Sequence, residues 1–219
     1  MTDRVRAILA SGPWAPQRSQ KWLELRNNMV TASDAAAVLG ISRFDTVDDI
    51  LYKKCGFEKR YSEMSLSAMK HGVYYEDIAR REYERVTGEI VHEVGLIQHP
   101  LYPFIGASAD GITESGKLIE IKCPKGALRT KIPDYYVPQI QLCLEVLDLE
   151  TCDYIEYSAD LNALKIFKVD RDREWFKRAL PIIQNFWDNV AVRRKMPLCE
   201  IILDKDENQE HDDEWNDEF

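Results

Sequence analysis

The sequence predicts a domain of mixed α/β (α+β) class, and two observations carry that prediction. The spacing of apolar residues changes from helical steps of three and four to strand-like alternation in the middle of the chain, and then returns to helical steps. The resulting order is helices, three strands, a helix, two strands and a final helix. A chain of 219 residues with 45% hydrophobic and 31% charged residues can bury one ordinary globular core.

Helices are predicted over most of the first part of the chain. Helix-breaking glycine and prolines interrupt residues 1–17, which therefore predict a loose lead-in. Thr31 or Ser33 is suited to cap one helix and Thr46 another, and Gly88 is suited to end the longest. The predicted helices cover residues 19–28, 34–39, 47–55 and 65–88.

Shorter alternating segments follow the long helix. Residues 117–123 (KLIEIKC) alternate, and residues 114–116 form a turn before them. Residues 133–147 return to helical spacing. The other predicted strands cover residues 90–98, 104–113, 154–158 and 164–169, and a last helix covers residues 175–192.

The net charge of −9 is concentrated at the end of the sequence. Residues 204–219 contain nine acidic residues and one lysine, so residues 1–203 carry a net charge of about −1. We expect one domain over residues 1–203 and an acidic, disordered tail over residues 204–219. The nearly neutral body leaves room for a basic DNA-binding groove. The tail would dock on a basic partner, restrain DNA binding by mimicking its charge, or only add solubility.

The sequence predicts an intracellular protein. Five cysteines without a CxxC pair argue against a disulfide framework and against an iron–sulfur cluster, and they fit a reducing compartment. The start of the chain has charges but no apolar signal-peptide core, and no apolar stretch approaches the ~20 residues of a membrane helix. The expected compartment is the cytoplasm of a bacterium or host cell, or the nucleus if the source is a eukaryotic virus.

One group of polar residues in the strand region has the composition of a hydrolytic site. Glu120 and Lys122 lie two residues apart on one strand face, and Asp110 lies ten residues before Glu120 across the turn. An antiparallel hairpin would bring Asp110 beside Glu120, with Gly111 marking a bend or bulge that aims the aspartate. The other strand face is apolar and would face the core.

Two carboxylates and an ammonium suit metal-assisted hydrolysis of a phosphodiester. Mg²⁺ prefers oxygen ligands, so Asp110 and Glu120 are candidate ligands, with the Ile121 carbonyl as a further one. The cation would activate water, while Lys122 would orient or deprotonate that water or offset phosphate charge. The four histidines are scattered and predict no zinc site. A solvated strand face next to an Asp-Gly turn would show the same residues without this chemistry.

The spacing of Asp110, Glu120 and Lys122 resembles the core of the PD-(D/E)xK nuclease superfamily, although Ala109 replaces the proline of that motif. More narrowly, five strings in family order resemble the lambda-exonuclease or YqaJ-type viral alkaline exonucleases. The resemblance implies a restriction-endonuclease-like core with a mixed sheet flanked by helices. The strings are WLELRNNMVTAS (22–33), HGVYYEDIAR (71–80), SADG (108–111), LIEIKCP (118–124) and YVPQIQ (136–141).

The same resemblance implies roles that spacing alone does not. Glu76 matches an additional acidic residue that helps to hold a second metal; by itself it would only form a surface pair with Arg80. Gln139 and Gln141 would lie beside the site and position the scissile strand or water, with Gln141 counted among the catalytic residues. The residues implied to bind DNA and its 5′-phosphate are Arg26, Thr31, Ser33, Ser108 and Gln139.

The implied activity is a Mg²⁺-dependent exonuclease, with Mn²⁺ as a substitute, that degrades one strand of linear duplex DNA from the 5′ end. The remaining 3′ single strands would serve a strand-annealing recombinase in DNA recombination and repair, and the family suggests a homotrimer around the DNA. Two alternatives are a structure-specific or single-strand endonuclease on the same fold, and a non-catalytic DNA-binding module. Four basic residues after residue 43 either contact phosphates or are solvated: Lys53, Lys54, Lys59 and Arg60.

Overall fold

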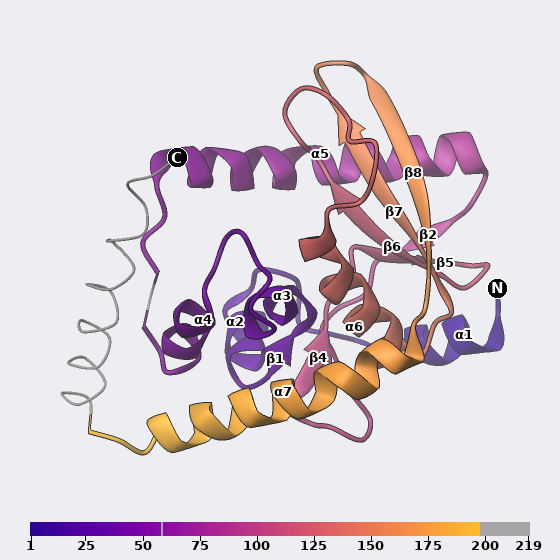
Figure 1. The fold of residues 1–219 in the computed structure, drawn as a ribbon. Coiled ribbons are helices and arrows are strands. Elements are labelled where there is room, and N and C mark those ends of the chain that lie inside the picture. Colours follow the sequence, from indigo (N-terminus) through magenta and orange to yellow (C-terminus); the bar gives the residue numbers. More distant parts are fainter. Residues whose placement is uncertain (58, 198–219) are drawn as a thin grey trace.

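Two sheets organise the fold in the computed structural model, which describes residues 1–57 and 59–197 (Figure 1). The larger sheet has five strands in the order β2-β5-β6-β7-β8, and the smaller has three in the order β1-β4-β3. β6 pairs antiparallel with β5 and parallel with β7, so the larger sheet is mixed and the predicted fold class is confirmed. The strands are β1 (Val30–Thr31), β2 (Val91–His92), β3 (Ile97–Gln98), β4 (Ile105–Ala107), β5 (Gly111–Thr113), β6 (Lys117–Lys122), β7 (Thr151–Ser158) and β8 (Ala163–Asp170).

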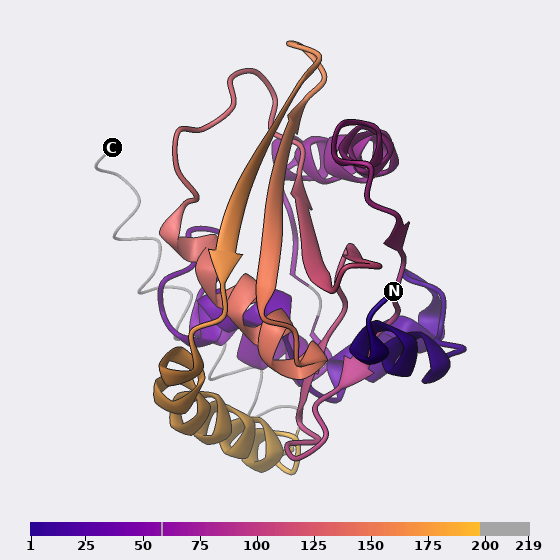
Figure 2. The same cartoon turned by 90° about the vertical axis from the view of Figure 1, so that its right-hand side faces the viewer.

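Helices cover both faces of the larger sheet (Figures 1 and 2). α5 (Glu63–Thr87) packs on one face, where Ala79 and Tyr83 join a cluster with Ile119 and Ile121 of β6. α6 (Val137–Leu147) packs on the other face and belongs to the main core together with Leu118. β6 is therefore buried on both sides, and the predicted apolar face is one of its two core faces.

The remaining helices build the layer around α6. η1 and α3 pack against α6, and α7 runs below them along the lower edge of Figure 1, in contact with α3, α4 and α6. The side chain of Asp172 caps α7 by accepting hydrogen bonds from the N–H groups of Glu174 and Trp175. These elements are α1 (Asp3–Ala10), α2 (Gln20–Asn27), α3 (Ala35–Val38), α4 (Val47–Lys54) and α7 (Arg173–Arg193), with the 3-10 helices η1 (Ala32–Asp34) and η2 (Asp134–Tyr136).

Several predicted helix ends are confirmed, although α5 begins at Glu63, two residues before its predicted start. The Ser19 side chain accepts a hydrogen bond from the Trp22 N–H at the start of α2. Thr46 does the same for the Asp49 N–H at the start of α4. Gly88 ends α5 with a φ of 73°, the left-handed conformation that glycine adopts without a steric cost.

Three predictions of secondary structure are wrong in detail. Residues 1–17 are not a loose lead-in, because α1 forms there and buries Val5 and Ile8 one turn apart. The predicted strands over residues 90–98 and 104–113 each split into two short strands, one in each sheet. The predicted helix over residues 34–39 is a 3-10 turn followed by the four residues of α3. Alternation reveals strand character, but it does not reveal where a chain changes from one sheet to another.

Two further predictions concern membrane-spanning helices and the acidic tail. No helix in the described ranges is long and apolar enough to cross a membrane. The predicted acidic tail over residues 204–219 lies outside the described residues.

Candidate active site

The β5–β6 hairpin holds the two carboxylates that the sequence places across a turn. Gly111 pairs with Ile119, so the next pair along the hairpin sets Asp110 opposite Glu120. The Ile121 N–H donates a hydrogen bond of 2.7 Å to Oδ2 of Asp110 and fixes the aspartate against β6. The predicted approach of Asp110 to Glu120 is confirmed, and the Ile121 carbonyl stays a predicted ligand.

Gly111 does not form the predicted bend or bulge. Its neighbours keep a regular ladder with β2 and β6. A Cβ at this position would lie 2.4 Å from Cγ1 of Val91 on β2. Glycine is therefore needed for the close approach of β2, and the bond from Ile121, rather than a bulge, aims Asp110.

Glu120 is an acidic side chain buried in the middle of the sheet. It is 0% exposed, and its Oε1 accepts hydrogen bonds from Nζ of Lys122 and, at 2.6 Å, from Nε2 of Gln139 on α6. Its Oε2 is buried and has no hydrogen-bond partner among the described residues. Burial raises the pKa of Glu120 to about 7; Lys122 opposes the rise, whereas Asp110 and Glu76 add to it. A bound cation would supply a partner for Oε2 and would stabilise the ionised form of the Glu120 carboxylate.

Lys122 keeps its proton in this arrangement. Burial disfavours its ammonium, but the carboxylates of Glu120 and Asp110 raise the pKa of Lys122 above its usual value. Its Nζ also lies 5.1 Å from the ring centroid of Tyr136. A lysine with a raised pKa is a hydrogen-bond donor, which suits two of its predicted roles, orienting water and offsetting phosphate charge; deprotonation of water stays a prediction.

Glu76 reaches the same site from α5. Its pKa is raised by burial and then by the charge of Asp110, which places the two carboxylates within electrostatic reach. Its Oε2 accepts a hydrogen bond of 3.0 Å from Nη2 of Arg18. Arg80 pairs elsewhere, so the alternative of a surface pair between Glu76 and Arg80 is wrong.

The donor set suits a hard divalent cation in its chemistry but is not assembled as a cage. Within residues 1–57 and 59–197, no three His, Cys, Asp or Glu side chains are arranged to hold a metal ion. Cationic and amide donors occupy Oε1 of Glu120 and Oε2 of Glu76. The unpaired Oε2 of Glu120 and the carboxylate of Asp110 opposite it are the oxygen donors that Mg²⁺ prefers. A cation bound here would give the unpaired Oε2 of Glu120 a partner, while Lys122 and Gln139 contact its other oxygen.

Arg26, Thr31 and Ser33 form a second polar group, which we term the Arg26 cluster. Nη2 of Arg26 donates to Oγ of Ser33 at 2.6 Å, and Oγ of Ser33 lies 3.2 Å from Oγ1 of Thr31. The guanidinium carbon of Arg26 lies 4.3 Å from the ring centroid of Trp22, one helical turn earlier. Three of the five residues predicted to bind DNA and its 5′-phosphate are therefore brought together, with two hydroxyls beside a guanidinium.

A buried ion pair, Lys54 with Asp34, contacts two residues of the Arg26 cluster. Nζ of Lys54 contacts Oδ2 of Asp34 at 2.7 Å, and both side chains are almost fully buried. Asp34 also accepts from the Thr31 N–H and hydroxyl, while Lys54 donates to the Arg26 carbonyl. Despite burial, Lys54 and Arg26 hold the pKa of Asp34 well below its usual range, so the pair is ionised.

Ser108 links this cluster to the carboxylates. Its Oγ accepts a hydrogen bond of 3.4 Å from Nε1 of Trp22, and it lies directly after β4, two residues before Asp110. Cys143 of α6 is within electrostatic reach of both groups: burial raises the pKa of its thiol, and the charges of Glu120 and Arg26 both act on it. The structure therefore places the predicted phosphate-binding residues next to the predicted hydrolytic ones.

Comparison with known proteins assigns the family. Residues 21–150 match the family model of the YqaJ-like viral recombinase domain. The chain belongs to this family. The YqaJ-like chain is 30% identical over 195 residues to protein R354 of Acanthamoeba polyphaga mimivirus, a match that covers 80% of this chain and 34% of R354. It is 26% identical over 209 residues to protein YqaJ of Bacillus subtilis strain 168, covering 91% of this chain and 64% of YqaJ.

A solved structure shares the fold of this YqaJ-like chain. The alkaline exonuclease LHK-Exo of Laribacter hongkongensis is 26% identical with a TM-score of 0.67, covering 88% of this chain and 99% of LHK-Exo. LHK-Exo in complex with dAMP is 28% identical with a TM-score of 0.68, covering 81% and 95%. The predicted family is confirmed. The chain spans about a third of R354 and less than two thirds of YqaJ, but nearly all of LHK-Exo.

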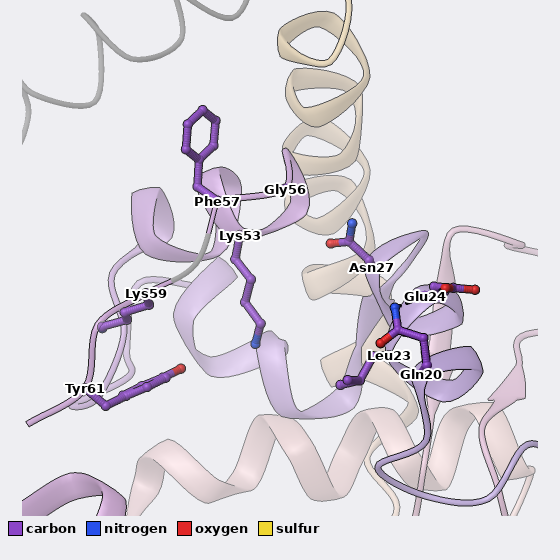
Figure 3. A pocket seen from close by; sticks show the side chains of 9 residues that line it. All are labelled: Gln20, Leu23, Glu24, Asn27, Lys53, Gly56, Phe57, Lys59 and Tyr61. Carbon is purple, nitrogen blue, oxygen red and sulfur yellow. Dashed lines mark hydrogen bonds between the residues drawn. The ribbon is translucent and has the colours of Figure 1, made fainter. Parts of the chain in front are cut away.

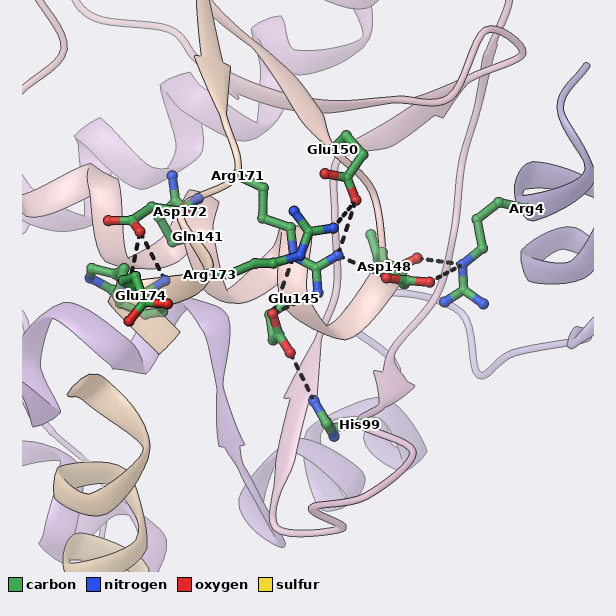
Figure 4. A network of polar contacts seen from close by, with 12 residues as sticks. Arg4, His99, Gln141, Glu145, Asp148, Glu150, Arg171, Asp172, Arg173 and Glu174 are labelled. Carbon is green, nitrogen blue, oxygen red and sulfur yellow. Dashed lines mark hydrogen bonds and ion pairs between the residues drawn. The ribbon is translucent and has the colours of Figure 1, made fainter. Parts of the chain in front are cut away.

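Gln141 lies away from the carboxylates in this YqaJ-like domain. Its side chain is 4% exposed, donates to the Asp170 carbonyl at 2.9 Å and accepts from the Asp172 N–H at 2.7 Å. Figure 4 shows Gln141 close to Asp172. Gln141 therefore ties α6 to the junction of β8 and α7. Two residues along a helix differ in direction by about 200°, so Gln139 and Gln141 cannot face the same site. The predicted position of Gln141 is wrong, while Gln139 does reach Glu120.

Replacement of Gln141 by leucine is expected to affect stability and not chemistry. The change leaves a buried N–H and a buried carbonyl unpaired, which lowers the free energy of unfolding by about 2 kcal/mol. Urea titration measures that loss, and cleavage assays on the folded protein should stay within about twofold of the wild type. Gln139→Leu is the matched control, because it removes the amide donor of Glu120 and should slow cleavage. Equal slowing by both variants would return Gln141 to the catalytic residues.

The four basic residues predicted either to contact phosphates or to be solvated lie in different environments in the YqaJ-like structure. Lys54 is buried in its ion pair, and Lys59 pairs with two neighbouring aspartates. Both predicted alternatives are therefore wrong for Lys54. Lys53 lines a hollow of 520 Å³ between α2 and the segment after α4 (Figure 3). Lys53 and Arg60 are exposed, and for them contact with phosphates stays a prediction.

Three residues of the site were missed from the sequence. Trp22 and Arg26 are four apart on one helix, a spacing that predicts contact and could have revealed the stacking. Arg18 lies in a connection with a φ of 65°, and nothing local points it at Glu76 on a distant helix. Lys54 looks like any lysine of a basic segment, and only the tertiary fold buries it.

Proposed function

We propose that this YqaJ-like domain is a Mg²⁺-dependent DNA exonuclease, with Mn²⁺ as a substitute, that degrades one strand of linear duplex DNA from its 5′ end. The observation that carries the proposal is the buried Oε2 of Glu120, unpaired among the described residues, opposite Asp110 and beside the ammonium of Lys122. The Arg26 cluster next to it supports a substrate with a terminal phosphate. The fold and sequence shared with LHK-Exo, an alkaline exonuclease, support the reaction class.

Each residue of the site has a separate role in the proposed reaction. Asp110 and Glu120, with Glu76 and the Ile121 carbonyl nearby, would hold the cation, which supplies charge neutralisation at the phosphate and activates water. Lys122 holds its proton at Nζ and donates it as a hydrogen bond to an oxygen of the scissile phosphate. Arg26, with Thr31 and Ser33, binds the terminal phosphate, and Ser108 contacts the strand between the two sites. Gln139 keeps Glu120 oriented.

Digestion of defined DNA substrates tests the proposal. A linear duplex with 5′-phosphates and a covalently closed circle are incubated with the full chain and Mg²⁺, beside a reaction with EDTA. We expect loss of the linear form only, from its 5′ ends, and no reaction with EDTA. Nicking of the circle would replace the exonuclease by an endonuclease. No cleavage with Mg²⁺ or Mn²⁺ at any pH would leave a non-catalytic DNA-binding module.

The resemblance carries two further proposals about assembly. A homotrimer around DNA would let one strand end be degraded over many steps without release. Light scattering after size exclusion should then give about three times 25.4 kDa, and a monomer would contradict it. The 3′ single strands would be passed to a strand-annealing recombinase, which co-precipitation with a partner of that class would test.

Arg26→Lys is expected to slow degradation specifically at phosphorylated ends. Lysine keeps the charge but loses the guanidinium fork and its stacking on Trp22. Charge-assisted bonds of this kind contribute about 1.5–3 kcal/mol, so cleavage of 5′-phosphorylated ends should slow by about 10- to 100-fold. Ends with a 5′-hydroxyl should react at the wild-type rate for that substrate. Lys21→Ala on the same helix is the control, and equal slowing of both kinds of end contradicts a terminal-phosphate role.

Mn²⁺ binding is expected to release a proton below neutral pH. The folded pKa of Glu120, about 7, lies above its ordinary value of 4.5. Between these values the native protein binds more protons than the unfolded one, so stability without metal falls as pH rises through this window. Below pH 7 a cation must displace that proton, and affinity should rise about tenfold per pH unit. Calorimetry in two buffers at pH 6 should show about one proton released, and none at pH 8. Equal release at both would contradict the assignment.

A further inference from the structure

A hollow of 390 Å³ lies beside Lys122, at the end of β6. Pockets that bind small molecules measure about 300–1,000 Å³, so a nucleotide unit fits its size. Three segments line it: the first half of α5, the residues after β6, and η2. We term it the His71 pocket, and the lining residues that decide its chemistry are His71, Gly72, Lys122, Lys125, Arg129 and Tyr136.

The His71 pocket has a cationic lining with an unpaired nitrogen. Nε2 of His71 is buried and has no hydrogen-bond partner among the described residues. Nζ of Lys125 contacts only a hydroxyl in the hydrogen bonds and ion pairs of the described chain, Oγ of Ser67 at 3.3 Å. Arg129 is held by Glu156 at 2.7 Å and adds charge from a fixed position. Donors of this kind bind phosphate oxygens.

Gly72 is a glycine in the middle of a helix, and it lines this pocket. It lies inside α5, where glycine is a poor helix former compared with alanine. A Cβ at this position would meet no atom within 4 Å, so no packing contact in the described structure requires glycine here. The helix therefore carries a destabilising residue that packing does not require, at a position that lines the pocket.

The pocket and the Arg26 cluster lie on different elements of the fold and share no residue. The Arg26 cluster is connected to the carboxylates by the Trp22–Ser108 hydrogen bond and lies near α6. The pocket is lined by α5 and adjoins the carboxylates at Lys122. A strand whose end occupies the cluster and whose scissile phosphate lies at Asp110 would continue into the pocket.

We propose that the His71 pocket binds the nucleotide that follows the scissile phosphate. Lys125 contacts the scissile phosphate, which is the 5′-phosphate of that nucleotide, from the side of the pocket, and the rings of His71 and Tyr136 flank its base. Gly72 leaves the room that the nucleotide occupies. The proposal rests on the proposed exonuclease function and names a substrate contact beyond the terminal nucleotide.

Binding of short DNA tests the proposal without cleavage. Calorimetry with the full chain and Ca²⁺ in place of Mg²⁺ compares dAMP with a 5′-phosphorylated dinucleotide. The wild type should bind the dinucleotide about tenfold more tightly, because one more phosphate and base are held. Gly72→Ala should raise Tm, yet reduce dinucleotide affinity to that of dAMP and leave dAMP affinity unchanged. Lys125→Ala should cause the same loss of dinucleotide affinity without the rise in Tm.

Two controls come from the same region. Val73→Ala and Lys70→Ala change exposed residues of α5 outside the pocket and should leave both affinities unchanged. A Gly72→Ala protein with a higher Tm and wild-type dinucleotide affinity overturns the proposal, as does a wild type that does not prefer the dinucleotide. If the wild type binds neither ligand and cleaves no DNA, the exonuclease function itself is overturned.

Discussion

Glu120→Gln is expected to lower cleavage of linear duplex DNA by on the order of 10²–10³-fold, the cost of removing one group that stabilises a transition state. Glutamine has the same shape and keeps an oxygen for Lys122, so the fold should persist. It removes a buried carboxylate whose pKa is raised to about 7, so Tm at pH 8 should not fall. Mn²⁺ binding, measured by calorimetry, should be lost together with activity.

A matched control separates this effect from a general loss of charge. Glu89 is another carboxylate beside the same sheet, where it pairs with Lys117 at 3.2 Å. Glu89→Gln should cleave DNA within about twofold of the wild type, as expected for a residue away from the chemistry. Wild-type cleavage by Glu120→Gln would remove the hydrolytic site from the hairpin and with it the proposed function.

Lys54→Met is expected to produce the largest loss of stability among these variants. It leaves Asp34 as an uncompensated buried charge, and breaking a buried pair in this way costs about 3–5 kcal/mol. The free energy of unfolding from urea titration measures the loss. Because Lys54 also holds the Arg26 carbonyl, preference for 5′-phosphorylated ends should weaken in the folded fraction.

A double variant and a neighbour test this explanation. Lys54→Met with Asp34→Asn removes both charges and should recover more than half of the loss. Lys53→Met, one residue earlier and exposed, should change stability by less than about 0.5 kcal/mol. If Lys54→Met is as stable as the wild type, the pair does not support the Arg26 cluster.

The approach of Asp110 to Glu120 could be predicted because it depends on local features. A short turn and the alternation of residues 119–123 indicate an antiparallel register without reference to the rest of the chain. The burial of Glu120 could not be predicted in the same way, because polar–apolar alternation normally indicates a strand with one wet face. α6 covers that face and β7 pairs along the edge of β6, and both come from later in the sequence.

The errors about individual side chains share a physical origin. Arg18 and Lys54 find their partners through the tertiary fold, Arg18 on a helix 58 residues later and Lys54 on a segment 20 residues earlier. No local propensity encodes such pairs. Gln141 is a different case, because helical geometry alone separates its direction from that of Gln139. That correction was available from the sequence, as was the buried stripe of α1.

The parallel pairing of β6 with β7 constrains the order in which the molecule folds. The β5–β6 hairpin is local and can close in microseconds, but its carboxylates are then still solvated. β7 is reached only after a crossover that contains α6, and non-local parallel pairing of this kind is slow. Burial of Glu120, and with it the rise in its pKa, therefore arrives late in folding. We expect a nascent chain that ends before β7 to carry every acidic group of the candidate site, yet to lack the buried environment that gives Glu120 its altered proton affinity.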